Sequence, residues 1–136
     1  MGTRSLTVFN DGKEEIAVMY RQYDGYPEGH GLDLADFLMG KTLINGIGGN
    51  YDATNAFNGM GCLTASVIAY FKDDIGNIYV RRAGTRDCGE EYIYTVYGSI
   101  GEQIKISVTK CWEDETVFDG YAYDFRAWLD NCNKKI

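Results

Sequence analysis

Alternating apolar and polar positions at the start of the chain predict a β-hairpin. Its arms are Ser5–Phe9 and Glu15–Tyr23, and Asp11-Gly12 between them allow the positive φ angles of a tight turn. The same alternation returns in the second half of the chain, where Tyr, Val and Ile favour strands. The strands predicted there, in consecutive antiparallel order, are Asn77–Arg82, Tyr92–Tyr97, Gln103–Lys110 and Thr116–Tyr123.

Other segments repeat apolar residues at the spacing of an α-helix. Leu32–Met39 is the first of these and ends before Gly40, a residue type common at helix C-termini. Met60–Phe71 has the strongest helical pattern, and because it carries no charge we expect it to pack on more than one side. The last predicted helix is Asp124–Cys132, which places its apolar residues on one stripe.

The stretch Lys41–Asn58, between the first two helices, shows neither period. We therefore expect a long loop, a feature that is often functional in a compact domain. Together these elements predict an α+β fold, with a mainly antiparallel sheet of about six strands and two or three helices packed on one side. The length of 136 residues corresponds to one domain, so we assign residues 1–136 to a single α+β domain.

The chain is acidic, with a formal net charge of −7 from 20 acidic and 13 basic residues. Proteins that coat nucleic acids need a cationic surface, so this balance excludes a DNA- or RNA-coating role. An acidic surface is compatible with simple solvation, and also with occupation of a basic groove on another protein. No apolar run approaches the length of a membrane span, so we expect no membrane association.

The cysteines indicate reduced thiols rather than a metal centre. No Cys-x-x-Cys pair occurs and the chain has one histidine, so the closely spaced ligands of a structural zinc site are missing. We expect no metal and no cofactor, and an intracellular, cytoplasmic location in which thiols stay reduced. The cysteines are Cys62, Cys88, Cys111 and Cys132.

The passage Tyr20–Gly31 has the most unusual composition in the chain. It combines aromatic rings with an arginine, an amide, carboxylates and the single histidine, which is the mixture that a small-molecule pocket requires. The alternative is a rigid turn that covers one end of the sheet and directs its polar groups to water. The candidate ligand-binding residues in this passage are Arg21, Gln22, Tyr23, Asp24, Tyr26 and His30.

Further candidates lie outside that passage. Arg82 and Arg86 belong to the basic cluster of the chain and could bind a phosphate through their guanidinium groups, or could simply compensate neighbouring carboxylates. Asn45 adds an amide from the long loop. Because His30 has no Ser or Cys beside it in a nucleophile motif, we predict no catalytic residues and a binding protein rather than an enzyme.

Three passages resemble a group of small uncharacterised phage and prophage proteins. Many small phage proteins counter host defence, and some sequester nucleotide-type immune signals such as ADP-ribose derivatives or cyclic dinucleotides, usually as homo-oligomers. The resemblance therefore implies a homo-oligomeric anti-defence protein in the cytoplasm of an infected bacterial host. The passages are Met1-Gly2-Thr3-Arg4-Ser5-Leu6-Thr7, Tyr20-Arg21-Gln22-Tyr23-Asp24-Gly25-Tyr26-Pro27-Glu28-Gly29-His30-Gly31 and Asn58-Gly59-Met60-Gly61-Cys62.

The function we predict is sequestration of a small nucleotide-derived immune signal without turnover. Tyr23 and Tyr26 would stack on the base, and one or more of the candidate arginines would contact phosphate. The remaining candidates, Gln22, Asp24, Asn45 and His30, would bind ribose or base edges. Two alternatives stay open: an acidic inhibitor that binds a host defence protein, and a small hydrolase that uses His30.

Overall fold

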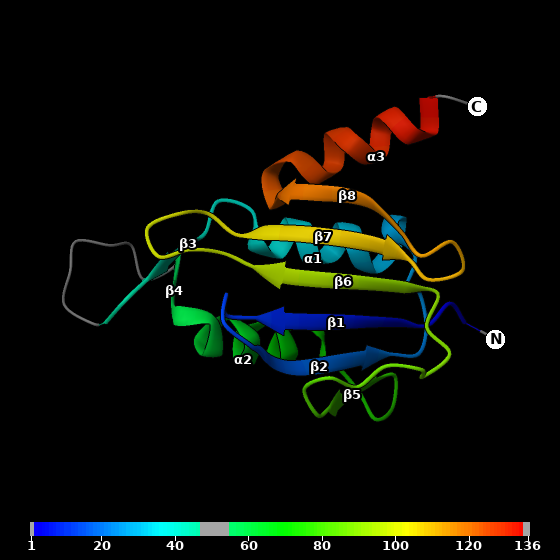
Figure 1. The fold of residues 1–136 in the computed structure, drawn as a ribbon, viewed down its shortest axis with the longest axis horizontal. Coiled ribbons are helices and arrows are strands. Elements are labelled where there is room, and N and C mark those ends of the chain that lie inside the picture. Colours follow the sequence, from blue (N-terminus) through cyan, green and yellow to red (C-terminus); the bar gives the residue numbers. More distant parts are fainter. Residues whose placement is uncertain (1, 47–54, 135–136) are drawn as a thin grey trace.

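The computed structural model describes residues 2–46 and 55–134, in which six strands form one sheet in the order β5-β2-β1-β6-β7-β8 (Figure 1). Neighbouring strands are antiparallel except for β1 and β6, which run parallel. The fold is the predicted α+β arrangement, with a mixed sheet. The strands are β1 (Ser5–Asn10), β2 (Glu15–Arg21), β5 (Ile78–Arg81), β6 (Tyr92–Tyr97), β7 (Lys105–Lys110) and β8 (Glu115–Tyr121).

Helices cover one face of this sheet. In Figure 1, α1 and α2 lie behind the sheet and α3 runs beyond β8. The main core forms between these helices and the sheet, where Leu34, Leu63 and Phe125 are completely buried. The bounds agree closely with the predicted helices. The helical elements are the π-turn η1 (Pro27–Gly31), α1 (Leu32–Leu38), α2 (Gly59–Phe71), the 3-10 turn η2 (Ala122–Asp124) and α3 (Phe125–Lys134).

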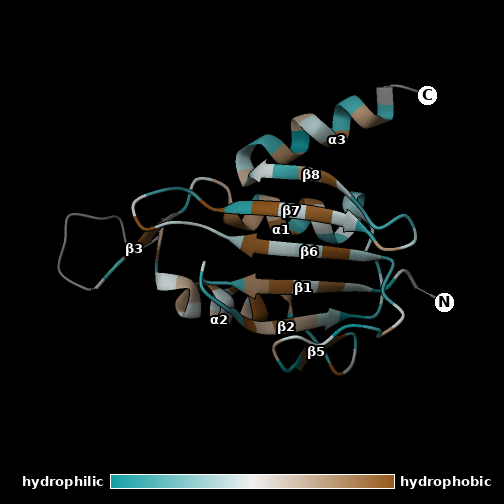
Figure 2. Ribbon diagram, viewed as in Figure 1, coloured by the Kyte–Doolittle hydropathy of each residue, from teal (hydrophilic) through white to brown (hydrophobic). Residues whose placement is uncertain are grey.

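Strand alternation decides which residues face the helices. In β6, Tyr94 and Val96 are completely buried on the helix side, whereas Tyr97 lies on the outer face and donates a hydrogen bond to Asp119. Figure 2 shows this alternation as hydrophobic and hydrophilic bands along β6 and β7. The central strand β1 differs, because residues 5–9 are buried on both faces. It therefore needs a neighbour on each side and cover on the outer face.

The predicted order of the late strands is wrong in one respect. β5 does not pair with β6; it lies at the edge of the sheet and pairs antiparallel with β2. The connection of residues 82–91 then crosses the outer face, where Cys88 packs against a small cluster of Leu6, Val8 and Val18. This crossing supplies the cover that β1 needs, and it leaves β6 free to pair with β1 in parallel.

The long loop predicted for residues 41–58 contains two strands. β3 (Thr42–Ile44) and β4 (Ala56–Asn58) pair in parallel, and the part between them at residues 47–54 lies outside the described residues. Leu43 connects this small sheet to the β6–β7 connection, because its N–H donates to Glu102 O and its carbonyl accepts from Gly101 N. A strand of three residues is too short to display an alternating pattern, so periodicity could not reveal it.

The prediction that α2 packs on more than one side is also wrong. Met60, Leu63 and Val67 are buried on one face, while Cys62 and Ala65 on the other face are exposed. Small uncharged residues are compatible with both environments, so the absence of charge did not indicate burial.

Close packing explains the glycines of the Tyr20–Gly31 passage. A Cβ atom on Gly31 would lie 2.7 Å from Phe125 Cζ and 3.0 Å from Tyr94 Cε1, and one on Gly25 would lie 2.7 Å from Ser5 Cβ. Both contacts involve completely buried partners. Even a methyl group therefore cannot enter without moving the core.

We expect Gly31→Ala to lower the free energy of unfolding by roughly 1–3 kcal/mol, because the new methyl overpacks the core. Gly61→Ala is the matched control: Gly61 lies exposed on α2, and a methyl group there would have no other atom within 4 Å, so helix propensity alone should stabilise the variant by about 0.5–1 kcal/mol. Urea denaturation measures both changes. Equal stability of Gly31→Ala and the unsubstituted protein would mean that the Phe125 ring moves to accommodate the methyl group, and that its contact with position 31 does not require glycine.

Candidate functional site

The π-turn η1 carries His30 into the interior, where its side chain is completely buried. Backbone hydrogen bonds close the turn: His30 N donates to Asp24 O, and Gly25 N donates to Thr3 O, both at 2.9 Å. The buried hydroxyl of Tyr94 donates to Gly25 O at 2.6 Å. The passage therefore packs closely across the end of the sheet and directs the polar side chain of His30 into the interior.

Both ring nitrogens of His30 are engaged. Arg21 Nη1 donates to Nδ1 at 3.1 Å, and since arginine can only donate, Nδ1 is the acceptor. The hydrogen is therefore on Nε2, which donates to Thr7 Oγ1 at 2.7 Å. The rings of Phe71 and Tyr94 enclose the imidazole, with centroids 4.7 and 5.0 Å away.

Burial, and secondarily the positive charge of Arg21, lower the pKa of His30 to about 3 from 6.5. Protonation would place a cation in an apolar enclosure and remove the acceptor that holds Arg21. His30 is therefore neutral at ordinary pH, and its function in the structure is to position the guanidinium.

Arg21 is held at two of the three nitrogens of its guanidinium group. Its Nε donates to Tyr23 O at 2.6 Å, its Nη1 donates to His30, and its Cζ lies 5.5 Å from the centroid of the Phe71 ring. Among the described residues no protein group accepts from Nη2. A half-buried arginine thus keeps N–H donors in a defined orientation for an external acceptor.

Arg21 lines a cleft of about 540 Å³, which we call the Arg21 cleft. The cleft lies between the start of α1, the end of α2 and the edge of the sheet formed by β2 and β5. Its volume falls within the range of about 300–1,000 Å³ of small-molecule sites. The lining residues are Arg21, Asp33, Ala69, Tyr70, Phe71, Lys72, Asp73 and Asn77.

Lys72 and Asn77 were missed by the sequence analysis. Lys72 follows α2, and its Nζ donates to the backbone carbonyls of Gly76 and of Ile78 at the start of β5, at 2.9 and 3.2 Å. Asn77 has a φ of 63°, and its backbone and side-chain oxygens accept from the N–H groups of Gln22 and Tyr23, each at 2.9 Å. In sequence, asparagine before a strand indicates only a turn, so nothing connected it with Arg21.

The other candidates of the passage lie outside the Arg21 cleft. Gln22 is half-buried, Asp24 is exposed, and the exposed fractions of Tyr23 and Tyr26 are 48% and 39%. Tyr26 Oη donates to the Asp24 carboxylate at 3.4 Å. The structure therefore brings Arg21 and His30 into contact, but of the residues predicted in this passage it places only Arg21 in the described lining of the cleft.

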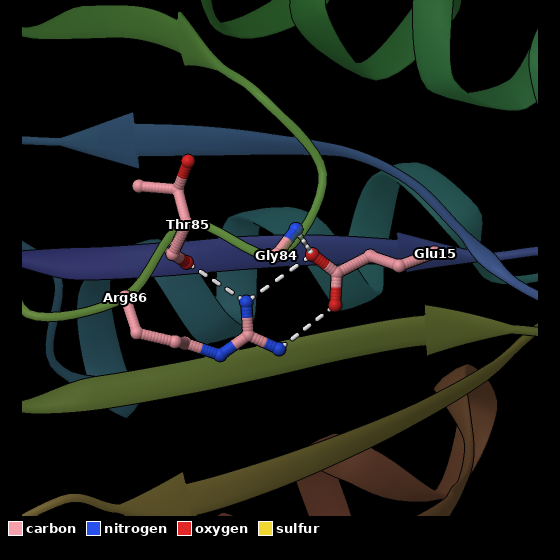
Figure 3. A network of polar contacts seen from close by, with 4 residues as sticks. All are labelled: Glu15, Gly84, Thr85 and Arg86. Carbon is pink, nitrogen blue, oxygen red and sulfur yellow. Dashed lines mark hydrogen bonds and ion pairs between the residues drawn. The ribbon is translucent and has the colours of Figure 1, made fainter.

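The candidates from other segments are also distant from the cleft lining. Arg86 forms a bidentate pair with Glu15 over the outer face, where Nη2 lies 2.8 Å from Oε1 and the Gly84 N–H donates to the same carboxylate (Figure 3). The hydrogen bond from Arg86 lowers the pKa of Glu15. Arg82 is exposed after β5. Asn45 is exposed and directly follows β3, which lies at the end of the sheet opposite the end of β2 (Figure 1).

No family model matches the sequence, and neither a curated protein nor a solved structure matches it. Within residues 2–46 and 55–134 no cluster of three or more histidine, cysteine or carboxylate side chains could hold a metal ion. In the same residues no helix has the length and apolar character needed to cross a membrane. The candidate site therefore rests on the geometry of the Arg21 cleft alone.

His30 makes the free energy of unfolding depend on pH below about 6.5. The unfolded chain binds a proton with a pKa near 6.5 and the folded chain only near 3, so stability is complete above pH 6.5 and falls as the pH decreases. We expect a loss of about 2 kcal/mol in the free energy of unfolding between pH 7 and pH 5. Urea denaturation across this range measures it.

The control is His30→Gln, since glutamine supplies an acceptor and a donor without titrating, and its stability should stay nearly level over this range. NMR of the single histidine gives an independent measure: its ring signals should not titrate above pH 5. A midpoint near 6.5 in the folded protein would contradict the buried, neutral imidazole.

Proposed function

We propose that this chain binds a small nucleotide-derived ligand in the Arg21 cleft and retains it without turnover. The observation that supports the proposal best is the guanidinium of Arg21, oriented by His30 and by the Tyr23 carbonyl with N–H donors left over. A planar, preoriented guanidinium suits the bidentate recognition of a phosphate. Holding it in place before binding also reduces the entropy lost when the ligand is bound.

The rest of the cleft is complementary to the other parts of a nucleotide. Lys72 adds a second cation beside Arg21, while Asp33 and Asp73 offer acceptors for ribose hydroxyls or amino groups. Tyr70, half exposed and stacked on Phe37 at 4.4 Å, offers an aromatic surface for a base. The lining thus combines cations for a phosphate with acceptors for hydroxyl or amino groups, which a nucleotide carries and a simple anion lacks.

The cleft offers little for catalysis. None of its described lining residues is Ser, Thr, Cys or His, and both nitrogens of His30 are already engaged. A general base must reach the proton that it abstracts, and a buried imidazole with a pKa of about 3 does not do so. These observations favour retention of the ligand over the alternative of a hydrolase that uses His30.

The biological role within this proposal comes from the resemblance to phage proteins. A protein that retains a nucleotide-type immune signal would inhibit host defence in the cytoplasm of an infected bacterium. We also predict, from the same resemblance, that the protein forms a homo-oligomer. The net charge of −7 keeps the other candidate open, an acidic inhibitor that binds a host defence protein.

Ligand binding is tested with a thermal-shift panel of nucleotides, ADP-ribose and cyclic dinucleotides. A ligand at 100 times its Kd should stabilise the fold by about 2.7 kcal/mol. Arg21→Gln should weaken that ligand about tenfold to a hundredfold, in line with the roughly 1.5–3 kcal/mol of a hydrogen bond to a charged group. Arg82→Gln removes the same charge from an exposed position outside the cleft and should bind normally.

Calorimetric titration gives the affinities, and circular dichroism checks that each variant is folded. A flat response across the panel would count against nucleotide binding. Equal weakening by both substitutions would locate the ligand elsewhere on the protein.

Retention is tested separately from binding. Ligand incubated with excess protein, released by heat and examined by mass spectrometry should return chemically unchanged, because His30, the residue of the hydrolase alternative, has no free ring nitrogen. A time-dependent product that disappears in His30→Gln would instead support the hydrolase.

A further inference from the structure

A second hollow, of about 370 Å³, lies beside α3 and is separate from the Arg21 cleft. It is bounded by η1, by the ends of β6 to β8 and by the second half of α3. We call it the α3 groove. Its described lining includes Tyr92, Trp128, Glu28, Glu115 and Lys110.

Aromatic rings form the walls of the α3 groove. Tyr92 meets Trp112 edge to face with centroids 5.2 Å apart, and Trp128 packs on Phe118 at 5.2 Å and Phe125 at 5.3 Å. Both walls are therefore anchored by neighbouring rings. Anchored rings lose little conformational entropy when a ligand packs against them.

Neither carboxylate of the α3 groove is held in an ion pair within the described residues. Lys110 lies opposite Glu115 in the pairing of β7 with β8, so the described lining has two carboxylates, Glu28 and Glu115, against one ammonium. Burial raises the pKa of Tyr92, and the negative charges of Glu28 and Glu91 raise it further. The described lining therefore has an excess of one negative charge.

Lys110 already places an ammonium group beside the α3 groove. It is the cation of the groove lining, and its ammonium lies 5.8 Å from the centroid of the Trp112 ring. The chain thus already places one ammonium on an aromatic face at this end of the sheet.

We propose that the α3 groove binds a small organic cation, an alkylammonium of the polyamine type. The ammonium would lie against the rings of Tyr92 and Trp128 and near the carboxylates of Glu28 and Glu115, while the alkyl chain fills the apolar part. A phosphate would be repelled by the same carboxylates. The inference does not depend on the Arg21 cleft, which shares no lining residue with the α3 groove.

Intrinsic fluorescence reports on this site directly, because both tryptophans of the chain lie at the α3 groove or in contact with its wall. Titration with spermidine at low salt should change the emission to saturation. Glu28→Gln/Glu115→Gln should shift the midpoint about tenfold higher. Glu14→Gln/Asp87→Asn removes the same charge from exposed positions elsewhere and should leave the midpoint unchanged.

Two further measurements separate specific binding from general attraction to an acidic protein. Magnesium chloride, a divalent cation without an alkyl chain, should not reproduce the response, and Trp112→Phe should retain it through Trp128. A flat titration overturns the proposal, and so does an equal shift in the two double variants or an equal response to magnesium. Arg21→Gln should bind spermidine normally. A failure of the nucleotide proposal can therefore be told apart from a failure of the spermidine proposal.

Discussion

The hydrogen bond that Arg21 donates to His30 joins the hairpin to the loop that closes its end. It exists only while the imidazole is neutral, and burial between Phe71 and Tyr94 keeps it neutral. The same ring donates to Thr7 on β1, so one side chain holds the loop to the neighbouring strands β1 and β2. The position of the guanidinium, and with it the character of the cleft, follows from this contact.

The passage around His30 serves packing on one side and presents polar groups on the other. Its glycines at 25 and 31 let the backbone approach β1, Tyr94 and Phe125 more closely than any side chain would permit. Its tyrosines at 23 and 26 remain partly exposed. The passage therefore acts both as a rigid cover for the sheet and as part of a binding site. The close packing that makes the turn rigid also buries His30, and His30 orients Arg21.

The local arrangement of charged side chains says more about this protein than its net charge does. Arg86 with Glu15 and Arg126 with Asp36 form pairs at the surface that make small contributions to stability. Arg21 instead lines the hollow for which we propose a phosphate-bearing ligand, and Glu28 and Glu115 line the one for which we propose an ammonium. The net charge of −7 excluded nucleic-acid coating, but it could not distinguish these two surfaces.

Local spacing was enough to predict most strands and all three main helices, because these depend on periods of two or 3.6 residues. It also singled out Arg21 and His30 by composition. The parallel pairing of β1 with β6 could not be predicted, since it joins residues as distant in sequence as Ser5 and Tyr92. The burial of His30 and the meeting of Arg21 with Asp33, Lys72 and Asn77 have the same origin: each element contributes one side chain, and only their packing makes a cleft.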